Sequence, residues 1–158
     1  MAGLLCKARI ETCALTGGAL KTAIQLKNAA NHAFRLMTWG VYFDGTSATN
    51  QPPIVYLYIP STDGTMSAPS GTTQTLEKQD QTRPETIQTT ALFNASADPT
   101  ISKELETKNV HPQNGYEKIY PYGHEILFGG ASAGAGRIAI AIKAANNVNA
   151  TAEMTFEE

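Results

Sequence analysis

Residues 137–143 read RIAIAIK and residues 149–156 read NATAEMTF, and both runs alternate with a period of two. In the first run three isoleucines share one face of an extended chain, and two alanines occupy the other face. In the second run the inward face is expected to carry Ala150, Ala152, Met154 and Phe156. Because only residues 144–148 separate the two runs, with a turn-like stretch at 144–147, the pattern predicts a C-terminal antiparallel β-hairpin.

A second strong strand is predicted at residues 34–43, which are rich in aromatic and β-branched side chains. Counting by twos gives one face with Met37, Trp39, Val41 and Phe43, and an opposite face with Phe34, Leu36 and Tyr42. Asp44-Gly45-Thr46 follows with residue types that favour a turn. Residues 54–59 are apolar on both faces, which is typical of a buried or interface strand.

Weaker alternation predicts further strands at residues 4–12, 22–26, 86–93, 105–110 and 125–128. A helix is an open alternative for residues 29–36 and 98–107, although neither segment has a 3.6-residue apolar stripe. About eight or nine short strands separated by Gly, Pro, Asn and Ser predict an all-β fold. We expect a single-domain antiparallel β-sandwich with a jelly-roll-like arrangement, and the strand order is left open.

The composition sets limits on partners and compartment. The 158 residues are 42% hydrophobic and 16% charged with a formal charge of −2, which suits one domain spanning residues 1–158. Near charge balance argues against direct binding to nucleic acid. No apolar run approaches the ~18 residues of a membrane helix, so no membrane partner is expected. Two cysteines, Cys6 and Cys13, predict reduced and partly buried thiols in a protein made in a cytoplasm.

Two segments are expected to lie apart from the packed strands. Residues 61–84 are rich in Thr, Ser, Gln and Gly, and they predict an extended polar loop or arm. Residues 1–20 form a possible N-terminal arm. Loops of such length tend to be functional or to be ordered by a partner.

The motifs of catalysis, cofactor binding and metal binding are missing from the sequence. The glycine-rich run at 129–136 is followed by a strand, where a dinucleotide fingerprint needs a helix. The histidines at 32, 111 and 124 lack the spacing of metal ligands. Acidic residues such as Glu104 and Glu153 are glycosidase candidates by residue type alone, and solvation explains them more simply. We therefore expect no enzyme activity, no cofactor and no metal.

Aromatic residues have the most suggestive placement. Two tyrosines share a strand face at 56 and 58, and three gather in the segment 116–122, which Pro and Gly interrupt. Tyrosine is enriched at interfaces because its ring buries well and its hydroxyl stays satisfied. Ordinary packing is an equal alternative, and a sugar-stacking platform is a third. The interface candidates are Trp39, Tyr56, Tyr58, Tyr116, Tyr120 and Tyr122.

Three stretches resemble small structural proteins of tailed bacteriophages. They are WGVYFDGTSATN at residues 39–50, VHPQNGY at 110–116, and the run at 137–158 that ends in FEE. The resemblance covers most of the chain from Leu20 onward. It implies a capsid decoration, or cement, protein of β-sandwich type on the virion surface, synthesised in the host cytoplasm. It also implies a homotrimer that binds the major capsid protein and carries no catalytic residues.

A carbohydrate- or receptor-binding module of a head fibre or spike is the second possibility. The tyrosines and the polar segment 61–84 suggest it. A decoration protein needs many modest contacts that act together. It stabilises the mature lattice by mass action alone, without chemistry. Capsid binding and glycan binding are therefore the two functions to separate.

Overall fold

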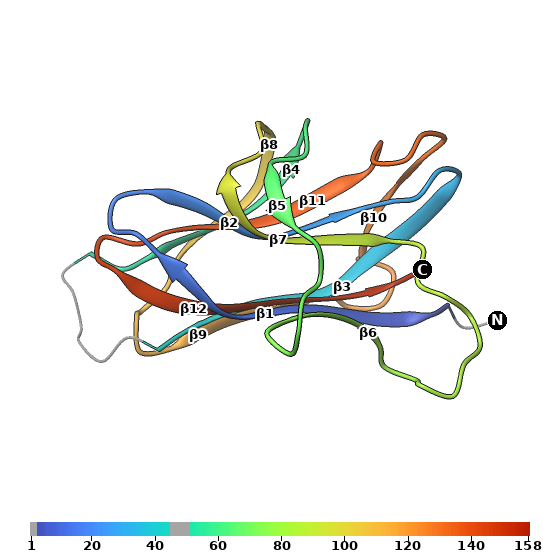
Figure 1. The fold of residues 1–158 in the computed structure, drawn as a ribbon, viewed down its shortest axis with the longest axis horizontal. Helices are drawn as coiled ribbons and strands as arrows, with labels where there is room; N and C mark the ends of the chain where they lie inside the picture. Colours follow the sequence, from blue (N-terminus) through green and yellow to red (C-terminus); the bar gives the residue numbers. More distant parts are fainter. Residues whose placement is uncertain (1–2, 45–50) are drawn as a thin grey trace.

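The computed structural model describes residues 3–44 and 51–158, which form twelve strands in two packed antiparallel sheets (Figure 1). In chain order the strands are β1 (Leu5–Leu15), β2 (Leu20–Lys27), β3 (His32–Phe43), β4 (Ile54–Pro60), β5 (Thr65–Ser67), β6 (Gln74–Lys78), β7 (Thr90–Ala97), β8 (Ile101–Asn109), β9 (Gly115–Ile119), β10 (Ile126–Gly130), β11 (Arg137–Lys143) and β12 (Val148–Glu157). Sheet A has the order β10-β3-β12-β1-β6, with β9 also paired to β3, and sheet B has the order β5-β7-β2-β11-β4-β8. The predicted all-β antiparallel sandwich is confirmed.

Strand pairing is nested about the middle of the chain. β1 pairs with β12, β2 with β11, β3 with β10, and β4 with β8. Strands β1 to β4 therefore alternate between the sheets, as β10 to β12 do on the return. Each of these pairs thus joins a strand from the first part of the chain to one from the second part. The inserted strands extend the edges, because β6 adds to β1 in sheet A while β7 and β5 add to β2 in sheet B.

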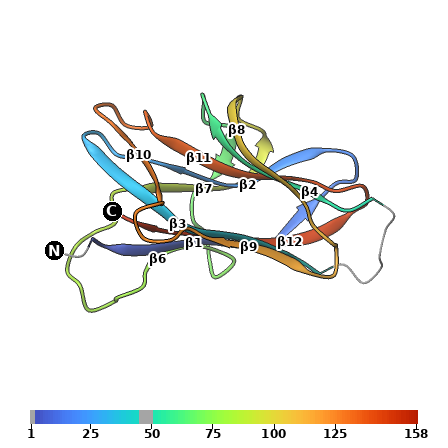
Figure 2. The same ribbon diagram turned by 180° about the vertical axis from the view of Figure 1, so that it is seen from behind.

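The predicted C-terminal hairpin is wrong, although both of its strands exist. β11 lies in sheet B between β2 and β4, whereas β12 lies in sheet A between β1 and β3. Residues 144–147 therefore cross from one sheet to the other (Figure 2). The predicted faces are confirmed, because the isoleucines of β11 and the apolar residues of β12 enter the same core from opposite sheets. Two alternating strands with a short link can therefore lie in two packed sheets as well as in one hairpin.

β3 forms as predicted, and its predicted faces are confirmed from Trp39 onward but wrong before it. The register between β3 and β12 shifts after Leu36, which leaves Met37 as a bulge. Since a bulge adds one residue to one strand, it inverts the alternation beyond it. Phe34 and Leu36 are consequently buried in the same core as Trp39 and Val41.

Both segments expected to be arms contribute strands. The N-terminal segment contains β1, which lies between β12 and β6, so its described residues do not form an arm. The segment 61–84 contains β5 and β6, which lie at the edges of the two sheets. Edge strands of this kind need few apolar residues, because one side of each strand meets solvent. The polar composition of residues 61–84 reflects that position.

The weaker strand predictions are confirmed with shifted ends. β1, β2, β8 and β10 overlap their predicted ranges, whereas β7 begins only at Thr90. Strands β3 and β8 occupy the two segments for which a helix was open. The sequence pattern does not predict β9. Of the turn predicted at Asp44-Gly45-Thr46, the last two residues lie outside the described part of the chain.

Candidate functional site

The six aromatic candidates divide into three places. The rings of Trp39 and Tyr116 pack with centroids 5.1 Å apart, and Tyr120 joins the same core. Tyr56 and Tyr58 lie together on the outer face of sheet B. Tyr122 is 93% exposed in the loop that precedes β10.

Burial corrects the interface assignment for half of these residues. Trp39 and Tyr58 have no exposed surface, and Tyr120 is nearly buried. These three side chains pack inside the folded chain and offer no surface to a partner. Burial raises the pKa of Tyr58 to about 12 even though its hydroxyl is hydrogen-bonded to Thr22. Of the six, Tyr56 and Tyr116 are half-buried and only Tyr122 is freely exposed.

An ionic cluster joins the two sheets next to Tyr116 and Tyr120. Glu106 of β8 accepts hydrogen bonds from the Tyr120 hydroxyl at 2.8 Å and the Lys118 ammonium at 2.5 Å. The same ammonium lies 4.9 Å from the centroid of the Tyr120 ring. Burial and the bond to Glu106 both raise the pKa of Tyr120, so its hydroxyl stays protonated at neutral pH. The arrangement fastens β8 of sheet B to sheet A and suits a structural role.

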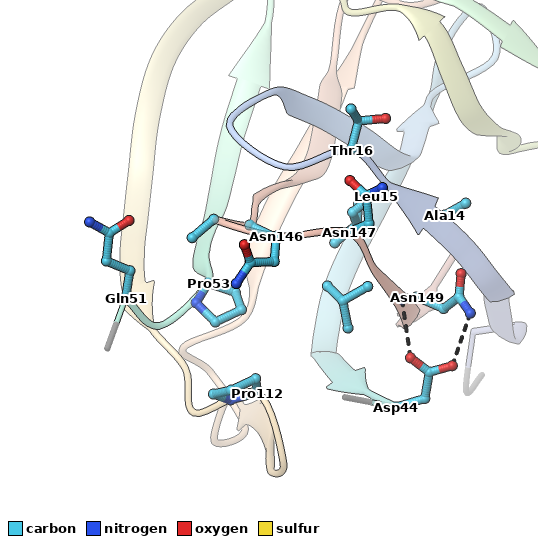
Figure 3. Close-up of a pocket in the computed structure, with 13 residues that line it drawn as sticks. Ala14, Leu15, Thr16, Asp44, Gln51, Pro53, Pro112, Asn146, Asn147 and Asn149 are labelled. Atoms are coloured by element: carbon cyan, nitrogen blue, oxygen red, sulfur yellow. Dashed lines mark hydrogen bonds between the residues drawn. The ribbon is translucent and has the colours of Figure 1, made fainter. Parts of the chain in front are cut away.

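The end of the sandwich that we call the loop end comprises residues 16–19, 51–53, 110–114 and 144–147. A pocket of 510 Å³ opens there between Leu15, Pro53 and Pro112 (Figure 3). The backbone and side-chain amides of Asn149 donate to the carboxylate of Asp44 at 3.1 and 3.0 Å (Figure 3). These two bonds fix the last described residue after β3 against the start of β12.

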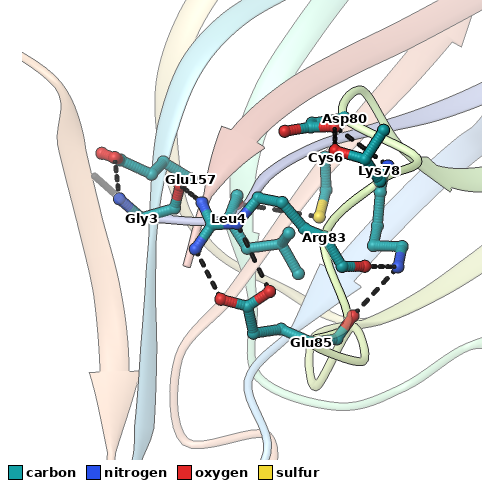
Figure 4. Close-up of polar contacts among 9 residues, drawn as sticks. Gly3, Leu4, Cys6, Lys78, Asp80, Arg83, Glu85 and Glu157 are labelled. Carbon is teal, nitrogen blue, oxygen red and sulfur yellow. Dashed lines mark hydrogen bonds and ion pairs between the residues drawn. The ribbon is translucent and has the colours of Figure 1, made fainter. Parts of the chain in front are cut away.

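At the opposite end of the sandwich, polar contacts tie the loop between β6 and β7 to the start of β1 (Figure 4). Arg83 donates to the carbonyl of Gly3 at 2.8 Å and pairs with Glu85 at 2.7 Å. Lys78 donates to the carbonyls of Arg83 and Glu85 at 2.6 and 3.2 Å. The loop thereby holds the start of β1, with Arg83 paired to Glu85 and the Lys78 ammonium bonded to backbone carbonyls.

The outer face of sheet A is polar and carries an aromatic residue that the sequence analysis did not select. Tyr42 lies over Gly40 and Gly115, where a Cβ at Gly115 would overlap the ring and one at Gly40 would lie 3.1 Å from the hydroxyl. Burial raises the pKa of Tyr42, and the carboxylates of Glu153 and Glu117 raise it further. A groove of 380 Å³ runs beside the ring. The two glycines, placed on paired strands, were the only signal in the sequence.

The described residues offer little for metal or thiol chemistry. Within residues 3–44 and 51–158, no three His, Cys, Asp or Glu side chains gather around a possible metal position. Cys6 and Cys13 are free and buried, as predicted. Burial raises the pKa of Cys6 to about 12, so this thiol is protonated at neutral pH and a poor nucleophile. No helix long and apolar enough to cross a bilayer occurs in the part of the chain that is described.

The pocket at the loop end and the groove beside Tyr42 are two of several hollows on the surface of the described residues. Cavities of 510 Å³ also lie beside Tyr122 and beside Arg83. Comparison with protein-family models, with curated proteins and with solved structures gives no match to this chain.

Proposed function

We propose that this chain is a decoration protein that binds the outer surface of a tailed-bacteriophage head through its loop end. The partner is the major capsid protein, and the acting form is a homotrimer. The proposal starts from the resemblance of three sequence stretches to phage structural proteins. A β-sandwich suits this role, because its sheets hold the loops in one fixed geometry.

The observation that carries the proposal is the convergence of those three stretches in space. One pocket at the loop end is lined by Asp44 from the first stretch, Pro112 from the second and Asn146 from the third (Figure 3). β3 pairs with both β9 and β12, so the strands that carry the stretches are neighbours. Each of the three stretches therefore contributes to this pocket, as a shared contact surface requires.

Three copies of a small contact surface give an affinity that one copy lacks. Once the first subunit of a trimer is bound, the others bind at a high effective concentration. If the surface of the expanded lattice is complementary and that of the immature shell is not, binding stabilises only the mature head. No bond has to be made or broken for this function.

Heads that lack this protein provide the test. Purified protein is mixed with expanded heads and with unexpanded shells, and binding is followed by co-sedimentation. We expect saturable binding to expanded heads alone, a raised melting temperature of the decorated heads, and a trimer in analytical ultracentrifugation. Absence of binding to expanded heads would falsify the proposal.

A matched pair of variants locates the contact. Asn146 lies at the loop end and Gln79 near the opposite end, and both are exposed. We expect Asn146→Arg to weaken binding by about tenfold or more, because an added charge at a contact must be desolvated. Gln79→Arg should bind as the parent protein does. Equal binding by both variants would place the contact elsewhere.

The carbohydrate-binding alternative loses part of its original support. Tyr120 is nearly buried and bonded to Glu106, and the polar segment 61–84 is partly built into the sheets. Substitution of Tyr120 would therefore test folding instead of recognition. The aromatic residue that bears on this alternative is Tyr42.

A further inference from the structure

We propose that the groove beside Tyr42, on the outer face of sheet A, binds a neutral saccharide. This activity goes beyond capsid attachment and does not depend on it. The groove has a volume of 380 Å³. Its lining includes Arg9, Glu11, Thr12, Tyr42, Asp44 and Asn149.

The ring of Tyr42 supplies a flat platform. One face of the ring rests on Gly40 and Gly115, both of which lack the side chain that would lift it off the sheet. The half-buried ring also lines the groove, so part of it is accessible to a ligand. A flat apolar ring with a polar tip is the surface on which the C–H face of a sugar stacks. Because the packing holds the ring in place beforehand, little conformational entropy is lost on binding.

Polar groups beside the ring match the hydroxyls of a sugar. Asp44 accepts two hydrogen bonds from Asn149 and, as a carboxylate, has capacity for two more. The guanidinium of Arg9 contacts Glu11 at 2.7 Å and retains further N–H donors. A held carboxylate and a held guanidinium can bind neighbouring hydroxyls as acceptor and donor. An aromatic platform with a few fixed polar groups is the usual composition of a small-molecule site.

A β-bulge shapes the wall of the groove. The register between β1 and β12 shifts between Ile10 and Cys13, so Glu11 and Thr12 form the bulge. Thr12 has a φ of +53°, which is rare for a β-branched residue. Bulges and strained residues of this kind are frequent beside binding sites, where they redirect side chains. The pairing of β6 with β1 ends at Ile10, and the N–H of Glu11 donates to the carbonyl of Thr73, just before β6, at 2.8 Å.

The charge of the groove selects among ligands. Among the described residues that line it, Arg9 is the one cation, whereas Glu11 and Asp44 are acidic and Glu117 is close enough to raise the pKa of Tyr42. An excess of carboxylates repels phosphate, sulfate and sialic acid. Nucleic acids and acidic glycans are thereby disfavoured, and an uncharged hexose or N-acetylhexosamine unit fits.

The test uses the intact free protein, without capsids, so that its outcome is separate from that of the decoration proposal. Glucose, galactose, mannose and N-acetylglucosamine oligomers are titrated into ¹⁵N-labelled protein, with sialylated and sulfated oligosaccharides alongside. We expect at least one neutral oligomer to shift the amide signals of Thr12, Tyr42 and Thr151. No shift with any neutral oligomer at millimolar concentration, or stronger binding of the acidic ones, overturns the proposal.

Variants then assign the binding to the ring. We expect Tyr42→Ala to lose about tenfold or more in affinity and Tyr42→Phe to retain most of it, because the ring and not the hydroxyl forms the platform. Tyr122→Ala removes an exposed tyrosine outside the groove and should have no effect. Arg9→Ala changes a surface side chain and should weaken binding several-fold even if Tyr42→Ala does not fold. If Arg9→Ala bound the sugar with unchanged affinity, and Tyr122→Ala lost as much affinity as Tyr42→Ala, the binding site would not be in this groove.

Discussion

The two sheets use their outer faces differently. On sheet A the charged side chains form open ion pairs, such as Lys7 with Glu153 at 2.8 Å, where the lysine is 36% exposed. On sheet B the side chains of Tyr58, Ala139 and Ala141 are fully buried, although they point away from the core between the sheets. The chain that follows β4 rises over sheet B in Figure 1, whereas on sheet A the half-buried ring of Tyr42 rests on Gly40 and Gly115.

Asp63 shows how the outer face of sheet B is closed. Its carboxylate accepts hydrogen bonds from Gln25 at 2.7 Å, Arg137 at 2.9 Å and Lys27 at 2.5 Å. These three partners come from β2 and β11, so one side chain fastens the segment before β5 across two strands. The closed outer face of sheet B therefore contributes to stability, whereas the outer face of sheet A carries the open groove beside Tyr42.

The largest expected effect comes from Tyr58→Ala. The substitution empties a fully buried site and removes the hydroxyl partner that lies 2.7 Å from Thr22. We expect a loss of about 3–4 kcal/mol in the free energy of unfolding, measured by urea denaturation. Tyr42→Ala on sheet A is the matched control, with an expected loss of about 1 kcal/mol. Equal losses in Tyr58→Ala and Tyr42→Ala would contradict the difference between the outer faces of sheets B and A.

Asp63→Asn should destabilise the protein by about 1–2 kcal/mol at neutral pH, because it leaves Lys27 and Arg137 without their carboxylate. Burial alone would raise the pKa of Asp63, but its bonds to the two cations outweigh this and hold the pKa below its ordinary 3.8. The folded state therefore binds this proton more weakly than the unfolded chain does.

The lowered pKa of Asp63 makes its contribution to stability depend on pH. Stability from Asp63 is fully present above the ordinary pKa of 3.8 and is lost as the pH falls towards the lower folded value. The difference between parent and Asp63→Asn should thus be constant from about pH 5 to 8 and shrink below about pH 4. A difference that grows as the pH falls would contradict this role of Asp63.

Gly115→Ala tests the seat of the tyrosine ring on sheet A. The new methyl group would overlap the ring of Tyr42, so we expect a loss of about 1–2 kcal/mol in the free energy of unfolding. In a Tyr42→Ala background the same change should cost little, because the ring is no longer there. A double-mutant cycle by chemical denaturation measures this coupling. Independent, additive effects would show that the ring does not rest on Gly115.

Lys7→Ala should have the smallest effect, below about 0.5 kcal/mol, since the Lys7 side chain is 36% exposed and salt screens its ion pair with Glu153. Thermal unfolding at low and high salt measures it, and the small difference should vanish in high salt. A loss as large as that of Asp63→Asn would mean that the two faces are energetically alike.

The candidate site was less predictable than the fold. Tyr116 and Tyr120 stand out in the sequence, yet the structure places Tyr120 against Glu106 and packs Tyr116 on Trp39. The local sequence gives Tyr42 only the features of an ordinary strand residue. Its platform depends on Gly115, which lies far along the chain and reaches it only through the pairing of β3 with β9. Because this contact forms only when distant strands pair, no local sequence pattern predicts it.

Alternation along the chain is enough to predict its strands and the apolar faces of β11 and β12, because alternation is a property of neighbouring residues. The choice of partner for each strand depends on the long-range fold. Residues 144–147 cross between sheets, Met37 is bulged, and residues 61–84 supply two edge strands. In each case the backbone hydrogen bonds are formed with distant segments, and the total burial of the sandwich selects among pairings that are locally equivalent.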